Sequence, residues 1–307
     1  MSSEHLASAQ NLLKGNLAGA WDILSGAQGL SGQIDVGIAR RFGGASAAYS
    51  LRDIGANGSR IVRVRRDTGG GAGDDDEEDF SANQINSGAL ESLVGAGNNG
   101  SVVTWYDQSG NGNDATTDAD TNEPIIVING SLINNEAGKP TIDFVPSSDF
   151  FNVPIVLDNI NTASVFCVWD RDVNSGNGAI AGQVGSSGST SRMYTPLFVS
   201  SNMYWGYGTS STAINLGTYN ANQTYLTSFV TGDTNAEAFL DNVSKGTTAI
   251  QSAAIDAANG SIGRHTRGST AFPLNGKVSE VIYYKNKLQA DVSKINTEIN
   301  NYYGIYS

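Results

Sequence analysis

The sequence predicts a mainly β protein built as a two-sheet antiparallel sandwich. From residue 102 onward, short strand-like runs follow one another closely with turn residues between them, a spacing typical of antiparallel sandwiches. Charged residues make up only 16% of the chain, and 37 of its 307 residues are glycine. This composition suits tight turns between strands better than helices. Hydrophobic residues, at 39%, are sufficient for a large core.

The strand prediction starts with residues 60–66, where apolar valines alternate with arginines and one face is therefore expected to be buried. Residues 87–94 predict a short helix that turns Leu90, Leu93 and Val94 inward. The later strands are predicted at 102–107, 125–128, 141–145, 163–170, 178–183, 194–199, 203–207, 224–232, 236–241, 260–264 and 277–284.

Residues 1–30 are predicted to form a helical attachment arm. Their apolar residues recur at near-helical spacing, at Leu6, Leu13, Leu17, Trp21 and Leu24. A helix this short cannot bury such a stripe alone, so it packs either on its own domain or on a docking partner. The Gly-rich residues 31–46 are expected to be a linker, and residues 47–307 the sandwich domain.

Two further segments have a distinct pattern. The acidic run Asp74–Asp79 follows a glycine run and predicts a solvated, mobile loop that is dispensable for folding. Near the end of the sequence an apolar stripe is followed by Gly304, which predicts a short C-terminal helix. The residues of this stripe are Val292, Ile295, Ile299 and Tyr302.

The charge balance and the cysteine count exclude several classes of protein. A net charge of −12 argues against nucleic-acid binding, which needs a basic face. The single cysteine, Cys167, cannot form an intrachain disulfide and is expected to be a small core residue. No stretch approaches the ~20 apolar residues of a membrane span. The sequence does not start with the cationic and apolar segments of a secretory signal, so we expect folding in the cytoplasm.

Three segments of the sequence resemble those of a known domain family. They are Trp105–Ala115, with the sequence WYDQSGNGNDA, the later pair Gly138-Lys139, and the predicted strand 277–284. Residues 100–307 resemble concanavalin A-like, laminin-G-like domains, which implies a jelly-roll sandwich. The order of strand-like segments ahead of this turn resembles sandwich domains of tailed-phage structural proteins. The run Tyr106–Asn113 also resembles arabinofuranosidase catalytic domains.

These resemblances imply a non-enzymatic virion structural protein of a tailed phage, either a capsid decoration or a tail or fibre component. Such a protein would assemble in the host cytoplasm as an oligomer with other virion proteins and could expose its lectin-like sandwich to host surface glycans. Two alternatives remain open at this stage. One is a carbohydrate-binding lectin module, and the other is a glycoside hydrolase of the arabinofuranosidase type.

One turn has the spacing of a calcium loop. Asp107, Ser109, Asn111 and Asp118 occupy positions 1, 3, 5 and 12, with Gly112 at the position of the sharp bend. The alternative is a strand turn whose Asp and Asn side chains cap backbone amides. No other cofactor is expected.

Carbohydrate chemistry has two sets of candidate residues. Four aromatic residues beside Gly- and Ser-rich loops could form a sugar platform, or else pack in the core: Tyr204, Trp205, Tyr207 and Tyr219. A glycosidase needs two carboxylates facing across the sugar, and none of the acidic residues lies in a recognisable catalytic motif. The candidates are Asp143, Asp149, Asp170, Asp172, Asp233, Glu237, Asp241 and Glu280.

Overall fold

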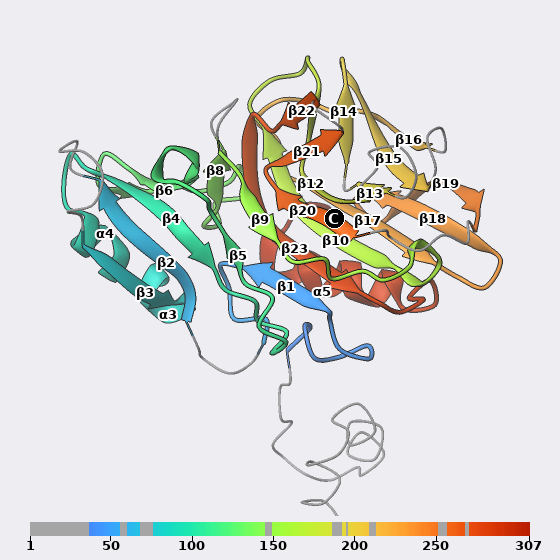
Figure 1. Cartoon of the computed structure of the whole chain (residues 1–307), viewed down its shortest axis with the longest axis horizontal. Helices are drawn as coiled ribbons and strands as arrows, with labels where there is room; N and C mark the ends of the chain where they lie inside the picture. The colour runs from blue at the N-terminus through green and yellow to red at the C-terminus, as the bar shows by residue number, and fades with distance from the viewer. Residues whose placement is uncertain are drawn as a thin grey trace, which may run out of the picture.

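The computed structural model describes residues 37–55, 60–67, 76–144, 149–185, 192–194, 196–208, 213–250, 257–267 and 270–307. Within these residues the protein is mainly β, with antiparallel strands and few helices (Figure 1). None of the helices in this part of the chain is long and apolar enough to cross a membrane. The predicted attachment arm, with its docking residues Leu6, Leu13, Leu17, Trp21 and Leu24, lies outside the described residues.

One row of strands runs β19–β18–β17–β10–β23. Its members are β10 (Ser164–Arg171), β17 (Tyr225–Thr231), β18 (Asn235–Leu240), β19 (Val243–Ala249) and β23 (Gly276–Tyr284). The central strand predicted at 163–170 is confirmed, because β10 pairs with β17 on one side and with β23 on the other. The free side of β23 is shared by β1 (Ala47–Ser50) and β8 (Ile142–Phe144).

A second row of strands runs β9–β20–β12–β13–β15–β16. Its members are β9 (Phe151–Val153), β12 (Ala181–Gly185), β13 (Arg192–Tyr194), β15 (Asn202–Gly208), β16 (Ala213–Thr218) and β20 (Ala257–Ile262). Short strands complete the edges: β5 (Ala115–Thr116), β6 (Ile125–Ile128), β7 (Ser131–Leu132), β11 (Gly178–Ala179), β14 (Leu197–Val199), β21 (Arg264–Arg267) and β22 (Thr270–Pro273).

The main core lies between these two rows. Alternate side chains of β10, including Cys167 and Trp169, point into it from the first row, and Ile262 and Trp205 point into it from the second. Trp205 stacks on Phe229 of β17 with ring centroids 5.1 Å apart. Burial of this one large apolar cluster supplies most of the drive to fold. The arrangement is consistent with the predicted sandwich.

The outer face of the first row is covered by the C-terminal helix α5 (Val292–Tyr303), as Figure 1 shows. Ile295 and Ile299 are fully buried against Phe166 and Ile282 of the sheet. The helix ends at Gly304, whose φ of 68° is a left-handed conformation that glycine adopts without a steric penalty. The predicted C-terminal helix is therefore confirmed, although Tyr303 rather than Tyr302 is its buried aromatic residue.

Residues 37–46 differ from the predicted linker at 31–46. Ile38 and Ala39 are buried and belong to the cluster beneath α5. The Tyr284 hydroxyl donates to the Ile38 carbonyl at 2.7 Å. Glycine content suggested a free connector here, but these residues pack as part of the domain.

The prediction that the acidic run Asp74–Asp79 forms a mobile loop is also corrected, for the part of the run that the structure describes. Glu77–Ser81 form the strand β3, which pairs with β2 (Arg60–Asp67), and β2 pairs in turn with β4 (Asn99–Trp105). Asp79 accepts from the guanidinium groups of Arg60 and Arg63 at 3.2 and 3.1 Å. The arginines of β2 therefore hold the described part of the run in a strand, whereas like charges alone predicted a loop.

Two short helices follow β3. The first, α3 (Ala82–Asn86), begins with a capping box in which Ser81 and Gln84 satisfy each other's backbone amides. The second, α4 (Ala89–Val94), buries Leu90 and Val94 and confirms the helix predicted at 87–94.

Candidate functional site

The turn after β4 is organised around the Asp107 carboxylate. Its Oδ1 accepts from the backbone amides of Ala48 and Ser109, each at 2.9 Å. Its Oδ2 accepts from the Ser109 hydroxyl at 2.7 Å and from the Asn113 amide at 3.0 Å. A short acidic side chain can serve a tight turn in this way because it reaches amides a few residues ahead. Asp107 therefore fixes the turn and joins it to β1.

The next residue, Gln108, is buried and ties the turn to the loop that follows β1. Its amide nitrogen donates to the carbonyls of Ser50 and Arg52 at 2.8 and 3.1 Å. Its amide oxygen accepts from the Ile54 amide at 2.8 Å. All the hydrogen-bonding atoms of this side chain are thus used within the fold, as expected for a buried amide.

Two asparagines connect the turn to the segment that precedes β1. Asn111 donates from Nδ2 to the carbonyls of Ala45 and Ser46 at 2.9 and 3.2 Å. Asn113 donates from Nδ2 to the Ser46 carbonyl at 2.8 Å. Both amide nitrogens are occupied, and no donor among the described residues is bonded to either amide oxygen. These oxygens are therefore acceptors for an external hydroxyl.

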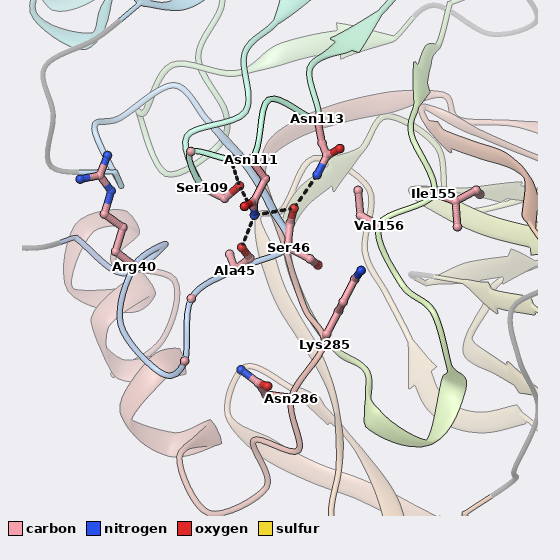
Figure 2. Close-up of a pocket in the computed structure, with 13 residues that line it drawn as sticks. Arg40, Ala45, Ser46, Ser109, Asn111, Asn113, Ile155, Val156, Lys285 and Asn286 are labelled. Carbon is pink, nitrogen blue, oxygen red and sulfur yellow. Dashed lines mark hydrogen bonds between the residues drawn. The ribbon is translucent and has the colours of Figure 1, made fainter. Parts of the chain in front are cut away.

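A cavity of about 800 Å³ opens beside this turn. Figure 2 shows the turn and the segment before β1 on one side of it, with residues that follow β9 and β23 on the other. Its lining residues are Arg40, Gly43, Gly44, Ala45, Ser46, Ser109, Gly110, Asn111, Asn113, Ile155, Val156, Lys285 and Asn286. The volume lies in the range of small-molecule binding sites.

The lining combines amide groups, an apolar wall and two cations. Asn286 donates from Nδ2 to the Phe42 carbonyl at 3.1 Å, so its oxygen, like those of the two turn asparagines, accepts from no described donor. Ile155, which is partly exposed, supplies the apolar wall in front of the buried Val156, and Lys285 extends towards Val156 (Figure 2). Sugars present both hydroxyl groups and apolar C–H faces, and this lining offers a partner to each.

Glycine is required at one point of the rim. Gly43 has a φ of 87°, and a Cβ built there would lie 2.3 Å from the side-chain nitrogen of Asn286. A larger residue would therefore both strain the backbone and displace Asn286 from the cavity wall.

The predicted calcium ligands do not converge. The carboxylate of Asp107 is filled by the four donors of its own turn, and Asp118 is bonded instead to the Asn152 amide. Across the described residues no group of three or more His, Cys, Asp or Glu side chains could hold a metal ion. This geometry favours the turn interpretation over the calcium interpretation for Asp107, Ser109, Asn111 and Asp118.

The four aromatic residues predicted to form a sugar platform do not share an exposed surface. Trp205 is fully buried in the core. Tyr219 is also buried, where its hydroxyl accepts from Arg171 Nη1 at 2.6 Å. Tyr204, which precedes Trp205 in β15, is half-buried, and the Tyr207 side chain lies outside the described set. Trp205 and Tyr219 therefore follow the core-packing alternative.

Three of the candidate carboxylates are brought together on the outer face of the sheet. In the cross-strand register Lys277 of β23 lies between Asp143 of β8 and Asp170 of β10. The Lys277 ammonium is 3.3 Å from Asp172 Oδ1 and 3.6 Å from Glu136 Oε1. We call Asp143, Asp172, Glu136 and Lys277 the acidic cluster.

Asp143 is the titratable group of interest in this cluster. Partial burial, reinforced by the negative charge of Asp172, raises the pKa of Asp143 to about 6. Asp170 has a structural role instead, because it is fully buried and its Oδ2 accepts from the Glu136 amide at 2.9 Å. Asp143 thus has the raised pKa of a general acid beside a second carboxylate.

The remaining candidate carboxylates lie elsewhere and are bonded within the fold. Glu280 is buried and accepts from Ser50 and from both Arg52 Nε and Nη2, all within 3.0 Å. Asp241 accepts from the Leu226 amide at 2.9 Å. Glu237 and Asp233 do not join the acidic cluster, whereas Asp149 lies close enough to Asp143 for its negative charge to contribute to the raised pKa of that residue.

Sequence reasoning did not identify the cavity residues Arg40, Ile155, Val156, Lys285 and Asn286. They come from segments far apart in the chain, and none lies in a motif. The sequence indicated this region only indirectly. It offered the Gly- and Asn-rich turn at 109–113 as part of a calcium loop, and this turn forms one wall of the cavity.

No protein-family model matches the chain, and no curated protein matches it. Among solved structures, it is similar to a GH54 α-L-arabinofuranosidase soaked with a cyclic sulfate inhibitor, with a TM-score of 0.58 and 11% identity over 83% of this chain and 62% of that one. It is also similar to an arabinofuranosidase complexed with arabinofuranosyl-α-1,2-xylobiose, with a TM-score of 0.52 and 13% identity over 82% and 62% of the two chains.

A weaker similarity is to the Trypanosoma rangeli sialidase in complex with sialic acid, with a TM-score of 0.46 and 14% identity over 64% of this chain and 30% of that one. The chain thus spans less than two thirds of each of these proteins. At these identities the similarity to the arabinofuranosidases establishes a shared fold.

The comparisons correct the expected function. The fold is shared with arabinofuranosidases, which are glycoside hydrolases. The expectation of a non-enzymatic virion structural protein is therefore wrong.

Proposed function

We propose that this chain is a carbohydrate-active protein that binds saccharide in the cavity beside the 109–113 turn. The observation that supports this most is the lining itself. Three amide oxygens, on Asn111, Asn113 and Asn286, accept from no described donor and are open to sugar hydroxyls, and the partly exposed Ile155 offers an apolar surface to a ring face. The fold shared with arabinofuranosidases is in keeping with such a ligand.

The test is a binding screen on an array of plant, bacterial and animal glycans, followed by calorimetry on the best ligand. We expect Asn286→Ala to weaken binding about tenfold, since it removes a hydrogen-bonding group at the ligand. Asn134→Ala is the matched control, because Asn134 is an exposed asparagine outside the cavity. Equal loss in both variants, or no glycan bound by the wild type, would reject the cavity as a saccharide site.

A second candidate function, glycoside hydrolysis, is favoured by the acidic cluster. Asp143 would act as the general acid because its raised pKa keeps it protonated up to about pH 6. Asp172 would be the second carboxylate of the pair. In this proposal Lys277 holds Asp172 and Glu136 in place by ion pairing.

Hydrolysis is tested with 4-nitrophenyl α-L-arabinofuranoside and with arabinoxylan, measuring nitrophenol and reducing sugar. Asp143→Asn and Asp172→Asn should each abolish release, whereas Asp233→Asn, on an exposed carboxylate that pairs with Lys287 outside the cluster, should not change it. No release by the wild type on either substrate would remove this candidate and leave the binding proposal intact.

For the fold, we propose the concanavalin A-like jelly roll within the sandwich class. The two strand rows with a shared core, and the helix on the outer face of one of them, support this. An experimental structure superposed on a lectin of that class tests it. A different strand order in the two rows would contradict it.

A further inference from the structure

The cavity has a cationic lining in an acidic protein. Among the described residues, Arg40 and Lys285 are its charged lining residues and no carboxylate lines it. The chain as a whole carries a net charge of −12. A positive cavity is therefore a local departure from the overall charge.

The nearest acidic groups do not cancel both cations. Lys285 is paired with Asp158 at 2.9 Å, but the Asp158 carboxylate is 74% exposed and lies outside the lining. Arg41, next to Arg40, is paired with Glu298. Within the described residues no carboxylate forms an ion pair with Arg40.

Asp107 is not among the residues that line the cavity. It lies behind the turn, and its two oxygens accept from the four donors of the turn and of β1. Arg40 is thus left without a carboxylate partner among the described residues, at the edge of the cavity and with its guanidinium directed away from Lys285 (Figure 2), and Lys285 is available once its exposed partner is displaced or shared.

We propose that the ligand of this cavity is an acidic saccharide, whose sugar rings carry a carboxylate or a sulfate group. Arg40 and Lys285 are its counter-ions, and the asparagine oxygens accept from its hydroxyls. The inference rests on the proposed saccharide function and adds the charge of the ligand. A guanidinium presents two N–H groups in one plane, which matches the oxygens of both acidic groups.

The overall negative charge does not oppose this assignment at physiological salt. Charges are screened beyond about 8 Å at that ionic strength. A ligand in the cavity therefore interacts mainly with the groups that line it. The cations at the cavity dominate over acids on distant surfaces.

The experiment compares acidic probes with their neutral forms by calorimetry. The carboxylate probe is tetragalacturonate, and its matched neutral form is the methyl ester. The sulfate probe is a carrageenan tetrasaccharide, with its desulfated form as the match. We expect the wild type to bind at least one acidic probe about tenfold more tightly than its neutral form, in line with the strength of charged hydrogen bonds.

Variants then assign the preference to the two cations. Arg40→Gln and Lys285→Gln should each reduce the ratio of the affinity for the acidic probe to the affinity for its neutral form. Lys287→Gln is the control, because Lys287 lies two residues after Lys285 and pairs with the exposed Asp233 outside the cavity.

Asp158→Ala provides a readout that a merely structural role would not change. It frees Lys285 from its partner, so affinity for the acidic probe should rise by about twofold to fivefold, in keeping with the modest strength of an exposed ion pair. Melting temperatures of all variants confirm that they are folded.

The outcomes separate the two proposals. Equal affinity for acidic and neutral probes, or a preference that survives both cation variants, overturns the acidic-ligand inference while saccharide binding stands. Failure of the wild type to bind any of the probes or any glycan on the array overturns both.

Discussion

At the scale of single residues, the turn at 107–113 shows how one carboxylate can organise a loop. Asp107 accepts four hydrogen bonds from three residues on two segments. The same geometry explains why a motif that resembles a ligand-binding loop can be structural. Both oxygens of the Asp107 carboxylate already accept hydrogen bonds from residues of the same chain.

We therefore predict that Asp107→Ala destabilises the protein by about 1–3 kcal/mol, because several backbone amides lose their acceptor. Chemical denaturation measures it, with Asp158→Ala as the control at an exposed ion pair. EDTA should leave the wild-type melting temperature unchanged. A drop in EDTA that calcium restores, and that the mutant lacks, would show that the loop holds metal.

The buried pair of Arg52 and Glu280 gives a second prediction at this scale. Glu280 is fully buried and takes both of its charged hydrogen bonds from Arg52. Arg52→Ala should cost about 3–5 kcal/mol, because it leaves a buried carboxylate without its counter-ion. Lys287→Ala, at an exposed pair, should cost less than about 1 kcal/mol. Similar losses in the two variants would contradict this account.

The raised pKa of Asp143 predicts a pH dependence. Burial raises it from 3.8 to about 6, so between those values the folded state binds more protons than the unfolded state. Stability therefore falls as pH rises through that window. Asp143→Asn should flatten the slope without abolishing it, because Asp241, raised to about 6 by burial, acts in the same direction. Urea unfolding from pH 4 to pH 7 measures this, and an unchanged slope would argue against the shift.

At the scale of elements, β3 shows the limit of a charge-based prediction. A run of like charges predicted a loop, but the arginines of β2 are spaced to face the acids of β3 across the strand pair. Asp79 also accepts from the Tyr106 hydroxyl at 2.8 Å. Such cross-strand partners become visible only once the register is known.

We predict that Asp79→Ala destabilises the protein by about 1–3 kcal/mol, since it removes the partner of the Tyr106 hydroxyl and of two arginines. Glu78→Ala, at an exposed position of the same strand, should stay within about 0.5 kcal/mol. Thermal and denaturant unfolding compare the two. Equal effects would restore the interpretation of this segment as a dispensable loop.

Helix α5 was easier to predict because its periodicity is local. Ile295 and Ile299 repeat at the helical period, so the buried face follows from the sequence alone. Ile295→Ala should cost about 2–5 kcal/mol through the cavity that it leaves, and Thr297→Ala, on the exposed face, about 0.5 kcal/mol or less. A small effect of Ile295→Ala would mean that α5 is loosely docked.

At the scale of the whole molecule, the sequence predicted the fold class better than the site. The alternation of apolar and polar residues and the spacing of turn residues predicted most strands, including β10 and β23. Such patterns are local, because each involves only a few consecutive residues. The cavity joins Arg40, Asn113, Val156 and Lys285, which only the folded arrangement brings together. The acidic cluster likewise depends on the register of β8, β23 and β10.

The position of β23 has a consequence for how the chain reaches this structure during synthesis. It is the last strand that the structure describes, yet it lies beside β1, β8 and β10. These strands leave the ribosome long before their partner exists, and their edges stay unpaired until residues 276–284 emerge. Such distant pairing slows folding and exposes strand edges to aggregation. Expression should therefore depend on translation rate and on chaperones that cover these edges.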